Sequence, residues 1–163
     1  MSSQNSIKIL TFPHPFLAKK TIVVKSLKDI EVKKTILYLK TAMEENNGKA
    51  AGLSANQIGR EHRIFAYKEE KGGEVFIVIN PEIISKKNEY VKSVEGCLSF
   101  PNQKTRNIKR FSEITVKYST ESGKTITEKI VLDERSRKLF IWQHEIDHLD
   151  GILFNQTDKI WEK

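Results

Sequence analysis

The sequence has one cysteine, no long hydrophobic run and few residues that break secondary structure. Because Cys97 is alone, no intramolecular disulfide can form, which excludes a disulfide-stapled scaffold. No segment approaches the roughly 18 consecutive apolar residues of a membrane-spanning helix, so an integral helical membrane protein is excluded. Residues 1–6 lack the basic start, apolar centre and small-residue cleavage site of a secretory signal. We therefore expect a cytoplasmic protein.

The composition is that of an ordinary globular chain with an excess of positive charge. With 163 residues and only 4 prolines and 8 glycines, we find no linker and expect one domain over residues 1–163. The net charge of +7 favours anionic partners such as RNA or the ribosome. A basic cluster lacks the interleaved aromatic residues of RNA-binding segments: Lys104, Arg106, Lys109 and Arg110. We interpret this cluster as a solvated face and expect no sequence-specific nucleic-acid binding.

An amphipathic helix is predicted near the N-terminus, over about residues 27 to 46 or 47. Ser26 with Asp29 resembles a capping box, and Gly48 provides a stop signal. Apolar residues at helical spacing form one buried stripe: Val32, Ile36, Leu39 and Met43.

Two hairpins and a second helix are predicted after the first helix. Residues 64–67 and 75–79 are rich in β-formers and flank a turn, and 114–118 and 126–132 form a similar pair. Asp133 is a plausible N-cap for a helix over about 134–150, which contains no glycine or proline. This order of helix, antiparallel strands and helix is typical of an α+β fold.

The second helix carries a motif typical of metal-assisted hydrolysis. In the segment 143–151, His144 and His148 lie four residues apart, so both imidazoles can reach one ion, and Glu145 lies beside them. Catalytic metal sites usually have three protein ligands. The only later glutamate or histidine is Glu162, which makes Cys97 the better third candidate, although a free cysteine is also often a small buried apolar residue.

A third segment, 50–57, consists mainly of small residues and ends in Gln57. Small residues allow a backbone to pass close to a ligand, and the amide of Gln57 could donate to an oxyanion. A simple turn after the first helix explains the same pattern. These residues alone leave both interpretations open.

Taken together, these segments resemble the motifs of the peptide deformylases, which remove the formyl group from the N-terminal methionine of new polypeptides. The matching segments are Glu-Gly-Cys-Leu-Ser at 95–99, Gln-His-Glu-Ile-Asp-His-Leu at 143–149 and the glycine-containing loop at 50–57, in the family's order. Pro-His-Pro-Phe-Leu at 13–17 and Ile-Asn-Pro at 79–81 are also similar to family segments. The implied fold is α+β, with mostly antiparallel strands around a central HExxH-bearing helix and an N-terminal helix.

The resemblance also implies a site. One divalent ion would be bound by Cys97, His144 and His148, with Fe(II) the usual ion and Zn or Ni as alternatives. Glu145 would move the proton of a water molecule, and Gln57 and the backbone N–H of Leu98 would stabilise the oxyanion. Glu95 and Gln143 would lie behind the ligands, where they hold the histidines or pack around them. The implied substrate-binding residues are Ala51, Gly52, Gly96 and Phe140.

The implied partners are nascent formyl-methionyl polypeptides and, transiently, the ribosome, and we expect a monomer. Because residues 156–163 form a short tail, we do not expect ribosome docking through a long C-terminal helix.

Several residues depart from the family pattern. Ala50 replaces a glycine, Ala51 a larger apolar residue and Ser54 an alanine. The smaller side chain of Ala51 would widen the methionine pocket. Arg137 stands where the family often has an apolar residue, so either its stem packs on the pocket wall with its charge outward, or substrate selection is altered.

Three other classes remain as alternatives. A small metallopeptidase using the same helix would need a ligand after His148 and would leave Cys97 unexplained. A non-catalytic binding protein could keep the fold without processing a substrate. Blue-copper electron transfer also uses two histidines and a cysteine, but a helical pair with an intervening glutamate does not suit it.

Overall fold

The computed structural model describes residues 6–103, 106–153 and 155. Within these residues the chain forms two α-helices, α1 (Ile30–Glu45) and α2 (Lys138–Leu149), and seven strands. The strands are β1 (Gly52–Ser54), β2 (Ile64–Tyr67), β3 (Phe76–Lys86), β4 (Tyr90–Glu95), β5 (Arg106–Phe111), β6 (Glu113–Ser119) and β7 (Thr125–Val131). Two short 3₁₀ helices are η1 (Pro15–Ala18) and η2 (Ala55–Ile58). The predicted α+β fold with mostly antiparallel strands is confirmed.

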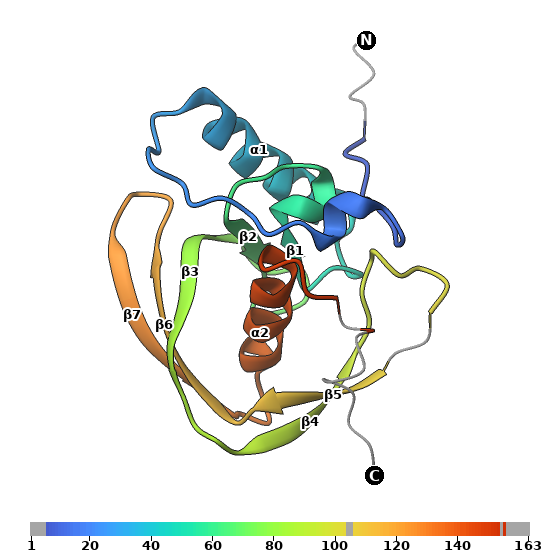
Figure 1. The fold of residues 1–163 in the computed structure, drawn as a ribbon, viewed down its shortest axis with the longest axis vertical. Helices are drawn as coiled ribbons and strands as arrows, with labels where there is room; N and C mark the ends of the chain where they lie inside the picture. The colour runs from blue at the N-terminus through green and yellow to red at the C-terminus, as the bar shows by residue number, and fades with distance from the viewer. Residues whose placement is uncertain (1–5, 104–105, 154, 156–163) are drawn as a thin grey trace.

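The strands form two sheets that curve around α2. A five-stranded sheet has the order β1-β2-β3-β6-β7, and β4 pairs with β5 in a separate two-stranded sheet. Every pair is antiparallel. In Figure 1, α2 lies within the curve of the strands and α1 covers the end of the molecule near β1 and β2. The elements that carry the predicted site residues therefore meet around α2.

Trp142 anchors α2 against the larger sheet. Its side chain is fully buried, and its ring meets those of Phe65, Tyr67 and Tyr118 in edge-to-face contacts, with centroids 4.9–5.6 Å apart. Aromatic pairs of this kind add to the free energy gained by burying the rings themselves. This packing fixes the rotation of α2, and with it the direction in which the remaining side chains of the helix point.

Helix α1 follows the predicted stripe but begins later than expected. The four stripe residues are buried, as the spacing predicted. The predicted capping box is wrong, because the Ser26 hydroxyl accepts from Lys28 N and lies in a turn before the helix. The N-cap is Asp29, whose Oδ1 accepts from Glu31 N at 2.8 Å. The helix ends at Glu45, within two residues of the predicted end.

The contacts of Asp29 and Ser26 predict how much each side chain contributes to the free energy of unfolding. Asp29→Ala should lower the free energy of unfolding by about 1 kcal/mol, because it leaves a helix-terminal N–H without its acceptor. Ser26→Ala is the matched control and should change it by less than half of that. Urea denaturation of both variants measures the difference. Equal effects of the two substitutions would contradict the assignment of Asp29 as the N-cap.

Helix α2 also begins later than predicted, at Lys138 instead of 134. The reason is local: Asp133 Oδ1 accepts from Arg135 N at 2.8 Å, and Ser136 Oγ accepts from Lys138 N at 3.2 Å. These side chains stabilise a tight turn, so Asp133 is not the N-cap. The helix ends at Leu149, one residue before the predicted end.

Both predicted hairpins are confirmed. Strand β2 pairs with β3, with Ile64 opposite Ile79, and β6 pairs with β7 over their whole lengths. The structure adds three features that the sequence did not predict: β1, the β4–β5 pair, and the continuation of β3 beyond Ile79. The register of β3 shifts after Ile79, where Asn80 has a positive φ of 52° and Pro81 follows. This irregularity lets the strand continue through an Asn-Pro pair that normally marks a strand end.

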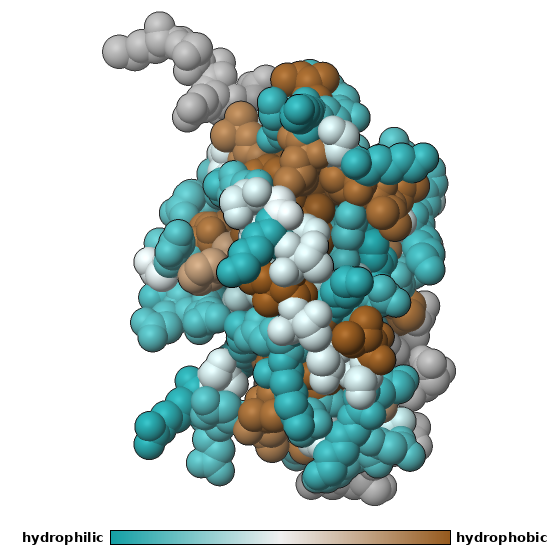
Figure 2. Space-filling model, turned by 90° about the vertical axis from the view of Figure 1, so that its left-hand side faces the viewer, coloured by the Kyte–Doolittle hydropathy of each residue, from teal (hydrophilic) through white to brown (hydrophobic). Residues whose placement is uncertain are grey.

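The surface is mostly hydrophilic, and the predicted basic face is only partly correct. Figure 2 shows hydrophilic side chains over much of one side, with a hydrophobic patch in its upper part. Lys109 is exposed, whereas Arg110 is only 3% exposed, because it forms ion pairs inside the protein. Lys104 lies outside the described residues. No helix in the described ranges is long and apolar enough to cross a membrane.

Candidate metal centre

Cys97, His144 and His148 bring three ligand atoms to one point. The Nε2 atoms of the two histidines are 3.1 Å apart, and His148 Nε2 is 3.3 Å from Cys97 Sγ. All three atoms lie within 4.8 Å of one another. The histidines come from one face of α2, and Cys97 follows β4. Residues separated by about fifty positions thus converge as the sequence predicted.

This arrangement fits a divalent transition-metal ion. Two nitrogen ligands of a tetrahedral ion are about 3.3 Å apart, and a nitrogen and a sulfur about 3.6 Å, given the usual bond lengths. The separation between the two histidines and that between His148 and Cys97 lie within a few tenths of an ångström of these values. Burial lowers the pKa of His148 well below its usual value, whereas at His144 burial is outweighed by the hydrogen bonds with Cys97 and Glu95, which raise its pKa. Metal binding requires both imidazoles to be neutral. Thiolate and imidazole ligands suit iron or zinc.

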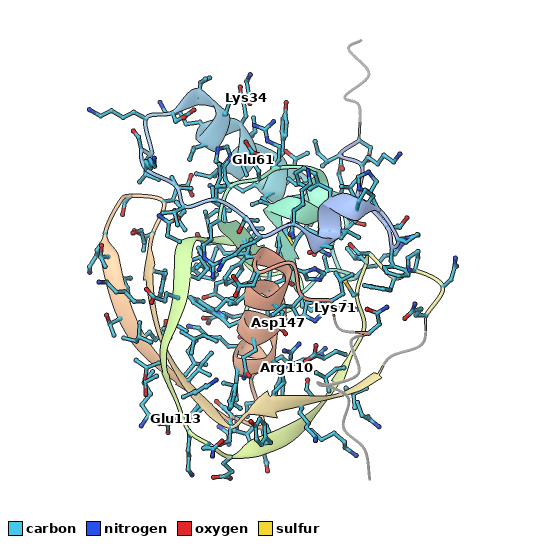
Figure 3. The ribbon with its side chains drawn as sticks, viewed as in Figure 1. Lys34, Glu61, Lys71, Arg110, Glu113 and Asp147 are labelled. Atoms are coloured by element: carbon cyan, nitrogen blue, oxygen red, sulfur yellow. The ribbon has the colours of Figure 1, made fainter. Side chains whose placement is uncertain are left out.

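The other ring nitrogen of His144 is held by a buried chain of charges. His144 Nδ1 lies 2.7 Å from Glu95 Oε2, and both oxygens of Glu95 accept from Arg110 at 2.7 Å. Arg110 also donates to Asp147 of α2, which is labelled just above Arg110 in Figure 3. Burial alone would raise the pKa of Glu95, but the bonds from Arg110 and His144 hold it well below its usual range. A carboxylate in this position orients a ligand imidazole and increases its basicity.

Of the two roles predicted for Gln143, the structure favours packing around the site. Its side-chain amide accepts from Phe111 N at 2.8 Å and donates to Phe111 O at 2.9 Å, so it fixes α2 to the end of β5, and these hydrogen bonds go to main-chain atoms and not to a ligand histidine. The carbonyl of His148 instead accepts from the buried amide of Asn56. Neither Arg110 nor Asn56 was predicted. In the sequence both residues look like surface residues, and only their contacts with residues distant in sequence show that they support the site.

Glu145 is buried beside the three ligand atoms. Its Oε2 accepts from Ser54 Oγ at 2.6 Å, while Oε1 has no hydrogen-bond partner in the part of the chain that the structure describes. Burial raises the pKa of Glu145. Gly52 lies against this carboxylate: a Cβ at position 52 would be 2.6 Å from Oε1. The absence of a side chain at Gly52 therefore makes room for Glu145.

Gly52→Ala should accordingly displace the Glu145 carboxylate. We expect kcat to fall by about a hundredfold, because a misplacement of about 1 Å in a reacting group has an effect of that size. Metal content should stay unchanged, since Gly52 contacts no ligand atom. Steady-state kinetics together with metal analysis test this, and unaltered kcat in a metal-loaded variant would contradict it.

Gln57 lies on η2 and reaches the same point. Its Nε2 donates to Ser99 Oγ at 3.0 Å and lies 3.5 Å from Cys97 Sγ, and its Oε1 accepts from Ser54 N at 2.9 Å. The backbone N–H of Leu98 donates to no other atom of the described ranges. An amide N–H and a free backbone N–H beside the sulfur are the donors that an oxyanion needs.

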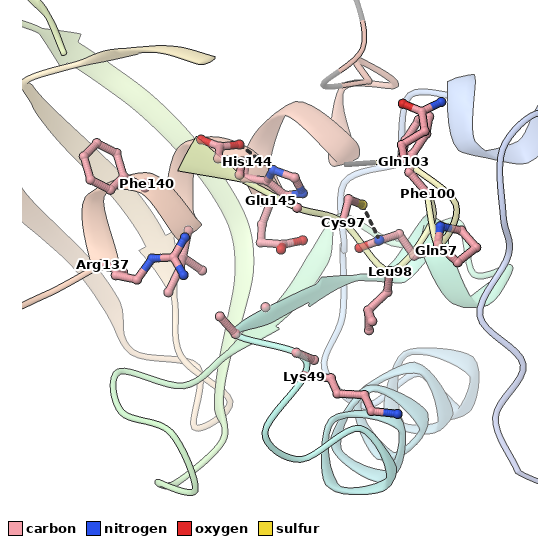
Figure 4. Close-up of a pocket in the computed structure, with 17 residues that line it drawn as sticks. Lys49, Gln57, Cys97, Leu98, Phe100, Gln103, Arg137, Phe140, His144 and Glu145 are labelled. Atoms are coloured by element: carbon pink, nitrogen blue, oxygen red, sulfur yellow. Dashed lines mark hydrogen bonds and ion pairs between the residues drawn. The ribbon is translucent and has the colours of Figure 1, made fainter. Parts of the chain in front are cut away.

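A cavity of about 390 Å³ opens beside these groups. Its walls include all four predicted substrate-binding residues: Ala51, Gly52, Gly96 and Phe140. Figure 4 shows Phe140 and Arg137 on one side, Leu98 and Gln57 on the other, and the Glu145 carboxylate between them. Arg137 is exposed, and its guanidinium donates to Val94 O at 3.3 Å.

Comparisons with known proteins match nearly the whole chain to proteins of one family. A family model described as polypeptide deformylase matches residues 6–162. A peptide deformylase of Desulfotalea psychrophila is 34% identical over 152 residues, covering 91% of this chain and 85% of the relative. One from Pseudothermotoga lettingae is 37% identical over 147 residues, covering 90% and 80%. The crystal structure of peptide deformylase from Thermotoga maritima superposes with a TM-score of 0.81 at 34% identity, covering 97% and 99%.

Proposed function

Because the chain belongs to the peptide deformylase family, we propose that it is a metal-dependent hydrolase acting on nascent polypeptides. It removes the formyl group from an N-terminal formyl-methionine and releases formate. One observation carries this proposal: the ligand atoms of Cys97, His144 and His148 converge at one point. Two of these residues, Cys97 and His144, line the same cavity as Glu145 and Gln57.

In this proposal each protein group has a defined part. Cys97, His144 and His148 hold a divalent ion, which supplies Lewis acidity and so makes water a stronger nucleophile at neutral pH. Glu145 Oε1, the oxygen without a partner among the described residues, accepts a proton from the attacking water. The new C–O bond forms at the formyl carbon. Glu145 then returns the proton to the departing nitrogen as the C–N bond breaks.

The formyl oxygen takes up negative charge during this step. Gln57 Nε2 donates to Ser99 Oγ at 3.0 Å and to Cys97 Sγ at 3.5 Å. An oxygen beside the sulfur is the stronger acceptor, so the N–H that faces Cys97 can donate to that oxygen instead. The N–H of Leu98 is the second donor. The loss of one such donor typically lowers the rate by about a hundredfold or more.

We also propose the details that belong to this function. The ion in the cell is Fe(II), with Zn or Ni able to replace it. One catalytic domain acts as a monomer in the cytoplasm, where the net charge of +7 favours transient contact with the ribosome. The methionine side chain enters the cavity along Ala51 and Phe140.

The alternatives are less well supported. A metallopeptidase would need a ligand after His148, and the only later histidine or glutamate, Glu162, lies outside the described residues. The short distance from Cys97 Sγ to His148 Nε2 favours the cysteine instead. A non-catalytic binding protein would have no use for a buried glutamate with one oxygen facing the cavity. Formate release separates these classes.

The direct test is purification under anaerobic conditions, followed by metal analysis and a formate-release assay on formyl-Met-Ala-Ser. We expect one equivalent of metal and steady formate release. Acetyl-Met-Ala-Ser is the matched control substrate and should react far more slowly. A protein that binds its metal but releases no formate would overturn the proposed function.

A further inference from the structure

Ser54 connects the two side chains that the proposed reaction needs. It stands at the end of β1, immediately before η2, and is fully buried. Its hydroxyl lies 2.6 Å from Glu145 Oε2 and 3.1 Å from the Glu145 carbonyl oxygen. Its backbone N–H donates to Gln57 Oε1 at 2.9 Å. One residue thus contacts Gln57, 3 positions away, and Glu145, 91 positions away.

The hydroxyl contact distinguishes the two oxygens of Glu145. Oε2 is occupied by Ser54, while Oε1 is left without a hydrogen bond from the described residues and lies over Gly52, at the cavity. A terminal carboxylate torsion is broad and roughly two-fold, so a glutamate without such a contact samples many orientations. The short bond from Ser54 selects one of them.

The backbone contact orients the second side chain. Because Ser54 N–H occupies Gln57 Oε1, the amide of Gln57 must turn its Nε2 toward Ser99 and Cys97. This bond comes from the main chain, so it survives a change of side chain at position 54. The two effects of Ser54 can therefore be separated by mutation.

We propose that Ser54 is a positioning residue of the hydrolytic site: its hydroxyl holds Glu145 Oε2 so that Oε1 faces the reacting water. The expected change in kcat rests on the proposed function, whereas the expected orientation of the Glu145 carboxylate rests on the hydrogen bond from Ser54 alone. The Ser54 hydroxyl touches neither substrate nor metal and acts only through Glu145, whereas the backbone N–H separately contacts Gln57.

In this chain the Ser54 hydroxyl is a partner of Glu145 Oε2, so Ser54→Ala should lower kcat by about tenfold even though it introduces the alanine of the family pattern. That is the size expected for losing a hydrogen bond to a charged group, and KM and metal content should stay unchanged. Ser93→Ala is the matched control: Ser93 is equally buried, and its hydroxyl has no partner in the described part of the chain. It should leave kcat unaltered. In a Glu145→Gln background, Ser54→Ala should have no further effect on the residual rate.

A readout independent of activity is the crystal structure of the metal-loaded protein. In the wild type the Ser54 hydroxyl should remain in hydrogen-bond contact with Glu145 Oε2, and in Ser54→Ala the carboxylate should adopt more than one orientation. Any of three results would overturn the proposal. They are an unchanged kcat in Ser54→Ala, a tenfold loss that Ser54→Ala still causes in the Glu145→Gln background, and a wild-type structure that lacks this contact. An inactive wild type that keeps the contact would overturn the proposed function and not the positioning of Glu145.

Discussion

Glu145→Gln should lower formate release by about a hundredfold to ten-thousandfold, which is the contribution expected of a general acid–base group. Glutamine has the shape of glutamate, and its amide oxygen can still accept from Ser54, so the side chain should stay in place. It cannot take a proton from water at neutral pH. The variant therefore separates proton transfer from positioning.

Two measurements make this result interpretable. Metal content should equal that of the wild type, because Glu145 is not one of the three clustered ligand residues. Glu61→Gln, at an exposed glutamate that does not line the cavity, is the matched control and should keep full activity. A metal-loaded Glu145→Gln protein with more than a tenth of the wild-type rate would show that another group moves the proton.

Cys97→Ser should remove the metal and abolish activity. The loss of an outer partner of a ligand weakens metal binding by about 10–100-fold, and the loss of a ligand itself should weaken it further. Metal analysis after dialysis measures the change. A variant that keeps both metal and activity would favour the metallopeptidase alternative, since Cys97 would then be dispensable.

The composition offers a second readout for this prediction. Cys97 is the only cysteine, so a thiol reagent reports on this one site. The holoprotein should resist the reagent, and removal of the metal by a chelator should release one reactive thiol per chain. A thiol that reacts equally before and after chelation would exclude Cys97 as a ligand, whatever the activity of the serine variant.

The sequence predicted elements whose pattern is local. The apolar stripe of α1 and the alternating hairpin strands appear within single windows, and both were found in the structure. Helix starts were predicted less well. Asp29, Asp133 and Ser136 all have side chains that can cap a helix, but only Asp29 is an N-cap, that of α1. Asp133 and Ser136 stabilise the turn before α2 instead. Strand β1 has three small or apolar residues and gives no periodic signal.

The predictions for the candidate site divide in the same way: local motifs named the ligand residues, whereas the long-range contacts were missed. The ligand set followed from motif resemblance, and the structure brings the predicted residues together at one point. The contacts that hold them did not follow, because they join residues distant in sequence. Arg110 looked like part of a basic surface, although its charge is buried against Glu95. Ser54 was visible only as a departure from a family pattern, and nothing local to it indicates Glu145.

The buried pair of Glu95 and Arg110 has a consequence for how the chain assembles. In the observed register Val91 stands opposite Arg110, and Glu95 and Arg110 point to the same buried face. A slip of one residue between β4 and β5 would turn Arg110 to solvent and leave a buried carboxylate unpaired, at a cost of about 3–5 kcal/mol. The same slip would separate that carboxylate from His144. A mispaired hairpin is thus both unstable and unable to support the metal ligands. The register that is favoured in folding is therefore also the one that completes the site.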